Sequence, residues 1–312
     1  YAEPLYVPQI SVSDNNGVSL GVHNVVFAAT MNDSLYAIDA DSGAILWQRN
    51  YGPAMPSGAV EPTYHDIDDT IGIEGTPVID LTTNTIYFVS RNLLSDGTYP
   101  QYLNAADLST GAPKFGSPVE ITATYQSVAF DPKHQNQRPA LTLANGNIYI
   151  AWASHTDANT WHGWVIAYSA ANLAQTAVYC NTPDGTKGGI WQAGQGMTVD
   201  ANGNIYFSSG NGYYTANGAD TGNSFVKMTP SLGLLDWFTL LVAAFAFAAL
   251  ALHAALFLAS RTSGPVRERS ARAARRLFPA AIALWLACGV ASMRVAHLAM
   301  RPLAIAFLVV SI

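Results

Sequence analysis

Four short apolar segments recur along the first 231 residues, and this repeat constrains the fold more than any other feature of the chain. They read VVFAA from residue 25, IYFVS from residue 86, IYIAW from residue 148 and IYFSS from residue 205. Their starts lie 61, 62 and 57 residues apart. Each is rich in β-branched and aromatic residues, as buried strands are. The repeat predicts one structural unit copied about four times.

Each repeated segment has strand-like neighbours on both sides. TPVID, RPALT and GMTVD precede the last three, and EPLYV from residue 3 is the counterpart in the first unit. Asn-Gly pairs at 145–146 and 202–203 separate two of these strands from the core strand, and both residues tolerate the positive φ of a tight hairpin. Residues 34–48, 101–115 and 164–179 each predict two further strands around a short turn. Four antiparallel strands per repeat are typical of a β-propeller blade.

The segment VVFAATMNDSLYAIDADSGAILW resembles the repeat of the PQQ-like (pyrroloquinoline-quinone-like) β-propeller family. The stretch from QNQRPALTLANGNIYIAW to MTVDANGNIYFSSGNG is similar to secreted bacterial members. The resemblance implies an extracytoplasmic, closed ring of seven or eight blades. We therefore expect an all-β partial β-propeller of about four blades over residues 1–231, the last incomplete. Such a half-ring leaves two edges open, and a second copy of the chain could close it.

Enzymes of this class that use the quinone carry adjacent cysteines, a calcium-binding Glu/Asn/Asp set and a tryptophan floor. This chain has two cysteines, Cys180 and Cys288, one in each half, and no Cys-Cys pair. We therefore expect neither PQQ nor Ca²⁺, and no disulfide, metal or redox motif from the cysteines.

The charge of the chain changes sign near residue 232. Residues 1–231 contain 7 Lys and Arg against 19 Asp and Glu, whereas residues 232–312 contain 8 Arg against 2 acids. The acidic first part excludes nucleic acid as a partner, because phosphate binding needs a basic face. This change in charge indicates that the first part of the chain lies in water and the second in lipid.

Residues 237–259 form an apolar run interrupted by one Thr and by His253. About 20 such residues span a bilayer core. We expect transmembrane helices at about 234–260 and 277–293, and a truncated third run from 302. An ionisable group in lipid is a candidate functional residue, although packing of a neutral His253 against a neighbouring helix also explains it.

The segment 261–276 between the first two apolar runs is rich in arginine and contains a single acid, Glu268. By the positive-inside rule this segment, expected as a loop, is cytoplasmic. The propeller then lies on the periplasmic or extracellular side of the inner (plasma) membrane, with membrane lipid as a partner.

Residues 232–312 resemble the middle of subunit II of cytochrome bd-type quinol oxidases, through LDWFTLL, LALHAALFL and the R-T-x-G-P-V segment. The resemblance implies a haem-bearing oxidase subunit as partner, with haem reaching this chain only through that subunit. The two families meet at GLLD, residues 233–236, without the polar linker that usually separates domains. The sequence therefore predicts a chimera of two unrelated parts, 1–231 and 232–312.

Two clusters of polar residues are candidate sites in the propeller. A ligand site could use histidines, a carboxylate and an aromatic ring of one blade: His134, His155, Asp157, Trp161 and His162. A calcium site could use an acidic loop between the first two blades: Glu61, His65, Asp66, Asp68 and Asp69. In both cases the alternative is that these are loop residues whose side chains only hydrogen-bond within turns or face solvent.

Three functions remain open at this point. The first is a membrane-tethered propeller that binds or scaffolds, without catalysis of its own. The second is a cytochrome bd subunit II fragment in respiratory electron transport, fused to an unrelated propeller. The third is a quinoprotein dehydrogenase fragment. Because Tyr1 opens directly on strand-like sequence without a signal peptide, we expect a fragment or a processed form.

Overall fold

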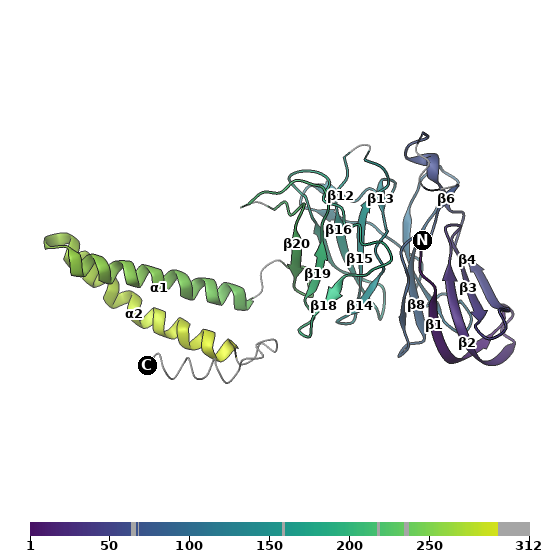
Figure 1. Ribbon diagram of the computed structural model, residues 1–312, viewed down its shortest axis with the longest axis horizontal. Helices are drawn as coiled ribbons and strands as arrows, with labels where there is room; N and C mark the ends of the chain where they lie inside the picture. The colour runs from purple at the N-terminus through teal and green to yellow at the C-terminus, as the bar shows by residue number, and fades with distance from the viewer. Residues whose placement is uncertain (64–66, 68, 158–159, 217–218, 234–236, 293–312) are drawn as a thin grey trace. The chain divides into compact units, whose positions relative to one another are not determined.

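The computed structural model describes residues 1–312 except 64–66, 68, 158–159, 217–218, 234–236 and 293–312. The chain divides into two compact units (Figure 1). One comprises Tyr1–Val199 and Ile205–Leu232, and the other Asp200–Asn204 and Gly233–Ile312. The first is built of β-sheets and the second of two helices, which confirms the predicted all-β part followed by an α-helical segment.

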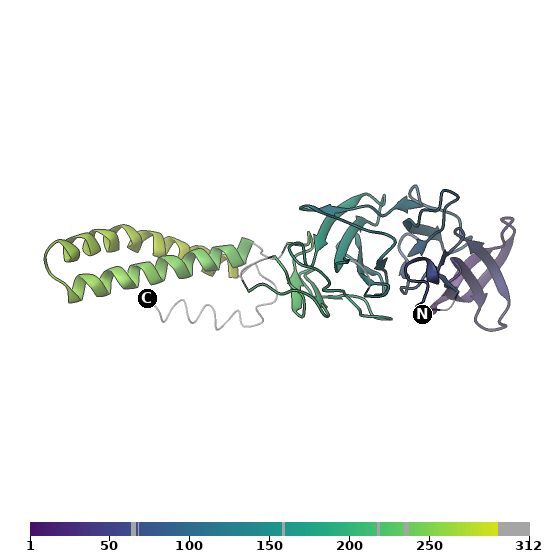
Figure 2. The ribbon, with the colours of Figure 1, turned by 90° about the horizontal axis from the view of Figure 1, so that it is seen from above.

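Four antiparallel sheets of the first unit each correspond to one repeat (Figures 1 and 2). Blade 1 is β1 (Leu5–Ser13), β2 (Ser19–Ala29), β3 (Ser34–Asp39) and β4 (Ile45–Asn50). Blade 2 is β7 (Val78–Asp80), β8 (Thr85–Arg91), β9 (Gln101–Asp107) and β10 (Val119–Glu120). Blade 3 is β13 (Gln135–Asn136), β14 (Thr142–Ala144), β15 (Asn147–Ser154), β16 (Trp164–Ser169) and β17 (Gln175–Cys180). Blade 4 is β18 (Thr198–Val199), β19 (Ile205–Ser208) and β20 (Phe225–Met228).

Short elements fill the connections between blades. β5 (Met55–Pro56) pairs with β6 (Thr70–Ile71), and β11 (Thr124–Tyr125) pairs with β12 (Val128–Ala129). A single 3₁₀ turn, η1 (Ser57–Ala59), follows β5.

The hairpin between β14 and β15 has the turn that its sequence predicts. Asn145 and Gly146 have φ of 54° and 71°, so both central residues are in the left-handed region. Ala144 and Asn147 close the turn as the last paired residues. This is the Asn-Gly arrangement whose twist matches the flanking strands.

The repeat in blade 1 begins one residue later than the sequence alignment places it. Val25 pairs with Asp39, as Thr85 pairs with Asp107 in blade 2. Val26 is therefore the counterpart of Ile86, and Phe27 that of Tyr87. The alignment from Val25 was wrong because every position of VVFAA is apolar. A shift of one residue exchanges the two faces of the strand without changing its apolar pattern.

Blade 2 lacks the long closing strand predicted within residues 101–115. Pro113 forms only an isolated bridge with Ala106, and β10 pairs with β9 in place of that strand. Proline has no N–H to donate to a ladder, so it ends regular pairing here.

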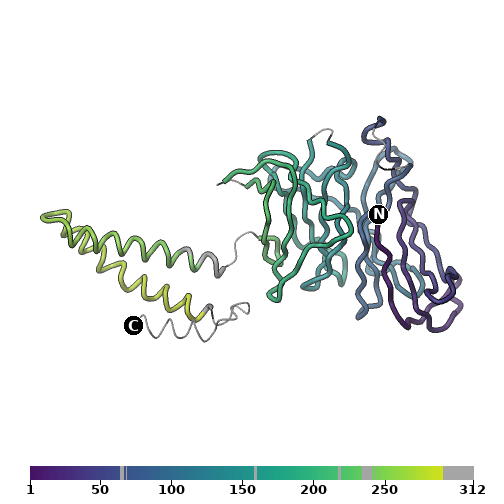
Figure 3. Tube along the Cα trace, viewed as in Figure 1, coloured from purple at the N-terminus to yellow at the C-terminus, as the bar shows by residue number. Residues whose placement is uncertain are grey.

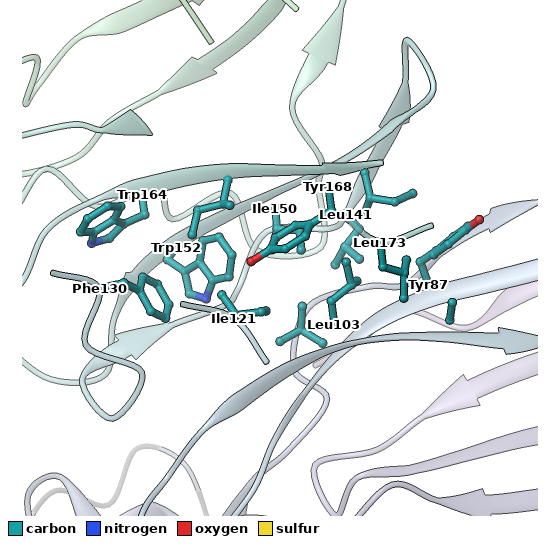
Figure 4. Close-up of a cluster of buried hydrophobic side chains, with 14 of the residues drawn as sticks. Tyr87, Leu103, Ile121, Phe130, Leu141, Ile150, Trp152, Trp164, Tyr168 and Leu173 are labelled. Carbon is teal, nitrogen blue, oxygen red and sulfur yellow. The ribbon is translucent and has the colours of Figure 1, made fainter. Parts of the chain in front are cut away.

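Adjacent blades pack through apolar faces. Tyr87 and Val89 of blade 2 share a core cluster with Ile150, Trp152 and Trp164 of blade 3 (Figure 4). Phe130 lies edge-on to both tryptophans of this cluster, with ring centroids 5.1 Å from Trp152 and 5.7 Å from Trp164. The other cores join blade 1 to blade 2 and blade 3 to blade 4 in the same way.

Two tyrosines at equivalent positions hydrogen-bond across these interfaces. The Tyr87 hydroxyl donates to the carbonyl oxygen of Ala170, and the Tyr149 hydroxyl to that of Pro230, each over 2.8 Å. Both residues are fully buried. Blades 2 and 3 therefore each present a tyrosine to the blade that follows, whereas blade 1 has Phe27 at this position.

The second unit is a pair of helices, α1 (Trp237–Arg261) and α2 (Gly264–Ser292) (Figure 3). Segments Ala244–Arg261 and Gly264–Val290 are long and apolar enough to cross a membrane, by length and composition. α2 includes residues 264–276 of the arginine-rich segment that we expected as a loop over 261–276, and Arg261 ends α1. Arg, Ala, Glu and Leu are good helix formers, and Pro265 occupies a first-turn position where its missing N–H costs nothing. The predicted third run from 302 lies outside the described residues.

Candidate functional site

A cavity of about 280 Å³ lies in the propeller unit beside blade 3. It is mostly polar, and its walls come from β13, the end of β15 and the loops that follow. The lining residues are Tyr1, Ile67, Asn136, Arg138, Ser154, His155, Thr156, Asp157 and Trp191.

A buried ion pair borders the cavity. The Arg138 Nε lies 3.3 Å from Oε1 of Glu74, whose side chain is almost fully buried while that of Arg138 is one-third exposed. Burial raises the pKa of Glu74, and Arg138 opposes the rise. Neither carboxylate oxygen accepts a hydrogen bond from the described residues. A buried charge with so few hydrogen bonds is costly, so Arg138 holds it in place.

A second buried network fixes Asn136, the amide that lines the cavity. The Arg91 Nη1 donates to Oδ1 of Asn136 over 3.0 Å, and Nη2 donates to the carbonyl oxygen of Lys133. The Arg91 backbone N–H donates to Oδ1 of Asp33 over 3.4 Å. Asp33 has no exposed surface, and burial raises its pKa to about 8. Burial also lowers the pKa of Arg91, to about 10.

Two of the predicted ligand residues line this cavity. His155 is buried, its Nε2 lies 3.2 Å from the carbonyl oxygen of Ser57, and its backbone N–H donates to the carbonyl oxygen of His134. Asp157 is exposed at the cavity wall. The imidazole of His134 points instead to Asp131, with 2.5 Å between Nδ1 and Oδ2.

The other two predicted ligand residues lie behind the wall. Trp161 is buried and contacts Trp191 edge-on, with ring centroids 5.9 Å apart. The His162 Nδ1 lies 2.9 Å from the carbonyl oxygen of Thr182, and burial lowers the pKa of this imidazole. Trp161 thus supports the cavity through Trp191, and His162 packs away from it.

The predicted calcium loop is only partly described, since His65, Asp66 and Asp68 lie outside the described residues. Glu61 accepts a hydrogen bond from the Thr63 hydroxyl over 2.9 Å. The carbonyl oxygen of Asp69 accepts one from the Ser57 backbone N–H. Among the described residues, no three His, Cys, Asp or Glu side chains group closely enough to hold a metal ion.

Sequence reasoning missed Glu74, Asn136, Arg138 and Trp191. One signal could have marked Arg138. The first 231 residues contain only three arginines, and two of them, Arg91 and Arg138, lie in this region. An arginine within strand-like sequence is rarely buried unless it is paired with an opposite charge, so such an arginine indicates a buried acidic partner.

The helical unit has its own apolar cavity, of about 740 Å³, between α1 and α2. His253 lines it together with Phe245, Ala249 and Trp285. The predicted membrane histidine therefore faces the second helix.

Comparison with known proteins gives two separate likenesses. Residues 196–312 match the family model of cytochrome bd terminal oxidase subunit II. The propeller resembles quinohemoprotein alcohol dehydrogenase from Pseudomonas putida, with a TM-score of 0.50 and 18% identity over 76% of this chain and 35% of that one. Two other solved structures match with lower TM-scores. They are quinohemoprotein alcohol dehydrogenase from Comamonas testosteroni (0.44, 16% identity, 76% and 36% covered) and a europium-containing methanol dehydrogenase (0.43, 16%, 73% and 42%). No curated protein matches the chain.

These likenesses support both resemblances found in the sequence, one through a family model over residues 196–312 and the other through the fold of the propeller unit. The match to the Pseudomonas enzyme shows the fold, and this chain spans about a third of that enzyme's length. The subunit II match and the two apolar helices indicate a membrane protein.

The described residues of the cavity do not supply the oxygen ligands of a Ca²⁺ ion. Among the lining residues that the structure describes, Asp157 is the only carboxylate, and Glu74 beside the cavity is already paired with Arg138. A Ca²⁺ ion normally takes six to eight oxygen ligands.

Proposed function

We propose that this chain is an extracytoplasmic binding module, anchored in the membrane by α1 and α2, that holds a small anionic ligand in the cavity beside Arg138. The observation that carries the proposal is the polar cavity itself, with a guanidinium, an amide, an imidazole and an indole on its walls. Such a mixture of a few polar groups and flat aromatic surfaces is typical of small-molecule sites.

The chemistry of the wall favours a carboxylate. A guanidinium offers two parallel N–H donors to a carboxylate, and Arg138 is one-third exposed, so part of it can reach a ligand. Asn136 is held in one orientation by Arg91, and Trp191 is held by Trp161. Little conformational entropy is lost when a ligand binds to side chains that are already fixed.

A fluorescence titration of the full chain in detergent with citrate and with benzoate tests this proposal. We expect a saturable change in tryptophan emission that Arg138→Gln abolishes and Trp191→Phe reduces. Lys227→Gln, an exposed cation on β20, is the matched control and should leave the titration unchanged. Thermal melting of each variant separates lost binding from lost folding. A response that persists in Arg138→Gln would assign the binding elsewhere.

The membrane anchor follows from the helices and from the distribution of arginine. By the positive-inside rule the segment 261–276 lies in the cytoplasm, which leaves the propeller on the outer side of the inner membrane. Protease added to right-side-out membrane vesicles should then digest the propeller and spare a fragment containing α1 and α2. Protection of the propeller would reverse the orientation.

A second function is favoured by the family match over residues 196–312. In this second function, the helices bind a haem-bearing oxidase subunit, and the propeller is an unrelated domain fused to them. Affinity purification of the chain from its source should then recover a haem spectrum. Sequencing source DNA across the codons for residues 224–240 tests the fusion itself, since one continuous molecule must span the join.

A second copy of the chain is the partner we propose for the open ends of the propeller. Blade 1 exposes Tyr6 and Val22 at 58% and 64%, and blade 4 exposes Phe225 at 76%. Phe225 stacks on Tyr206, the counterpart of Tyr87 and Tyr149, with ring centroids 6.0 Å apart. Both end faces therefore have the composition of the buried interfaces between blades.

A further inference from the structure

α1 and α2 run antiparallel, and their contacts fix how far each extends beside the other. Cys288, near the end of α2, contacts the carbonyl oxygen of Leu241, near the start of α1. At the other end, Leu252, Leu256 and Ala259 of α1 line one cavity with Ala271, Ala274 and Phe278 of α2. The arginine-rich first half of α2 therefore lies beside the last two turns of α1.

This alignment limits how deep the hairpin can sit in lipid. The apolar part of α2, residues 278–292, is 15 residues or about 22 Å long at 1.5 Å per residue. A bilayer core is about 30 Å thick, and an arginine within it is costly. The apolar part of α2 is thus already shorter than the core. Residues 256–276, which we call the hairpin tip, must then lie at the membrane–water interface, with their arginines at the level of the lipid headgroups.

The hairpin tip has a strong positive charge. Its arginines outnumber its one acid, Glu268, by six to one: Arg261, Arg267, Arg269, Arg272, Arg275 and Arg276. The arginines of α2 are all exposed, whereas Ser270 and Ala274 are buried on the side that faces α1. Within the described part of the chain, the ion pairs all belong to the propeller unit. The charge of the tip is therefore available to an external anion.

Apolar side chains are exposed among these arginines. Leu256, Phe257 and Val266 are 53%, 55% and 51% exposed. The Arg261 guanidinium lies over the Phe257 ring, 6.0 Å from its centroid. A soluble phosphate or an acidic protein would leave these apolar groups in water, whereas a lipid offers both a phosphate and an acyl chain.

We propose that the hairpin tip binds the headgroups of anionic phospholipids, with arginine guanidinium groups on the phosphates and Leu256, Phe257 and Val266 in the upper acyl region. Clusters of four to eight basic residues beside a membrane helix attract anionic lipid in this way. The inference rests on the proposed membrane anchoring of α1 and α2, and adds a lipid class to it.

The test uses the full chain reconstituted into vesicles of phosphatidylcholine and phosphatidylglycerol in equal amounts. After mild detergent extraction, the lipids that stay with the protein are quantified by mass spectrometry. We expect phosphatidylglycerol to be enriched about fivefold, the effect of roughly one well-placed basic residue. The enrichment should vanish when Arg267, Arg269, Arg272, Arg275 and Arg276 are all replaced by Gln, and should largely persist when they are replaced by Lys.

Two controls make the result specific. Lys133→Gln with Lys227→Gln removes cations from the propeller and should leave the enrichment intact. Inorganic phosphate added during extraction should not displace the lipid, and displacement would show a site for free phosphate and overturn the proposal. Equal enrichment in the five-Gln variant would also overturn it.

An alkaline carbonate wash of the vesicles separates this inference from the anchoring on which it rests. A chain that the wash releases is not anchored, and both proposals then fail. A chain that resists the wash but shows no lipid preference keeps its anchor, and only the lipid inference fails.

Discussion

The indole Nε1 of Trp47 donates a hydrogen bond to the carbonyl oxygen of Leu108 over 3.1 Å, which ties the last strand of blade 1 to a turn of blade 2. The same indole covers Gly111 in that turn. A Cβ added at Gly111 would lie 2.7 Å from Cγ of Arg49 and 2.9 Å from Cζ3 of Trp47. The turn therefore has room for glycine alone.

Gly111→Ala should destabilise the propeller by about 2–4 kcal/mol, from a positive φ of 66° and from displacement of Trp47. Gly43→Ala is the matched control. Gly43 occupies the equivalent turn of blade 1 at φ 76°, and nothing lies within 4 Å of its added Cβ. Gly43→Ala should lower the free energy of unfolding only through backbone strain, by about 1–2 kcal/mol. Urea denaturation of both variants checks the difference, and equal losses would contradict the role of Trp47.

The hydrogen bonds that tyrosines make between blades should contribute measurably to the free energy of unfolding. Tyr87→Phe and Tyr149→Phe each remove a buried hydroxyl and leave a carbonyl oxygen without its donor, so each should lower the free energy of unfolding by about 1 kcal/mol. Tyr6→Phe alters a tyrosine that is 58% exposed and should change it little. Chemical denaturation monitored by tryptophan fluorescence gives all three values. A loss in Tyr6→Phe as large as the others would show that burial is not the cause.

Asp33 should make the propeller less stable as pH rises. Burial raises the pKa of the folded Asp33 to about 8, above its ordinary value of 3.8. Between these two pH values the folded state therefore holds a proton that the unfolded state has lost. Stability from this group is therefore complete below about pH 4 and is lost as pH rises to about 8. The slope for one proton is about −1.4 kcal/mol per pH unit.

Asp33→Asn should remove that slope, because its amide cannot ionise and can still accept from Asn92, whose Nδ2 lies 3.0 Å from Oδ2 of Asp33. Denaturation curves at several pH values between 4 and 8 measure it. A variant whose stability falls with pH as steeply as that of the parent would show that other groups cause the dependence.

The exposed end faces should support pairing of two copies. We expect the full chain in detergent to sediment as a dimer, and Phe225→Lys to convert it to a monomer by placing a charge on the open face of blade 4. Leu81→Lys alters a residue that is 64% exposed in the β7–β8 turn and should leave the dimer intact. A monomeric parent chain would remove the second copy as the partner.

The sequence predicts the blades well, because each core strand carries a local signal of β-branched and aromatic residues flanked by turn residues. It misplaces the first repeat by one residue, because VVFAA is apolar in either register and only its pairing with β3 decides between them. It also assigns a loop where α2 begins, since a dense arginine cluster is typical of membrane loops as well as of helices.

The site was harder to predict because its polar partners are far apart in the chain. Glu74 and Arg138 are separated by 64 positions, and Asp33 and Arg91 by 58. No local spacing indicates such pairs. His155 and Asp157 were found because they are close in sequence, whereas Trp191 enters the cavity from a connection after β17.

The tyrosines that blades 2 and 3 present to the next blade make the stability of each blade depend on its neighbours. Blades 2 and 3 are covered on both sides by blades within the described chain, whereas blades 1 and 4 each have one covered face. In an array held together by nearest-neighbour contacts, order is greatest in the interior and decreases outward. Amide hydrogens of β8 and β15 should therefore exchange with solvent last and those of β20 early, so that the propeller opens from its ends while the tryptophan cluster between blades 2 and 3 remains closed.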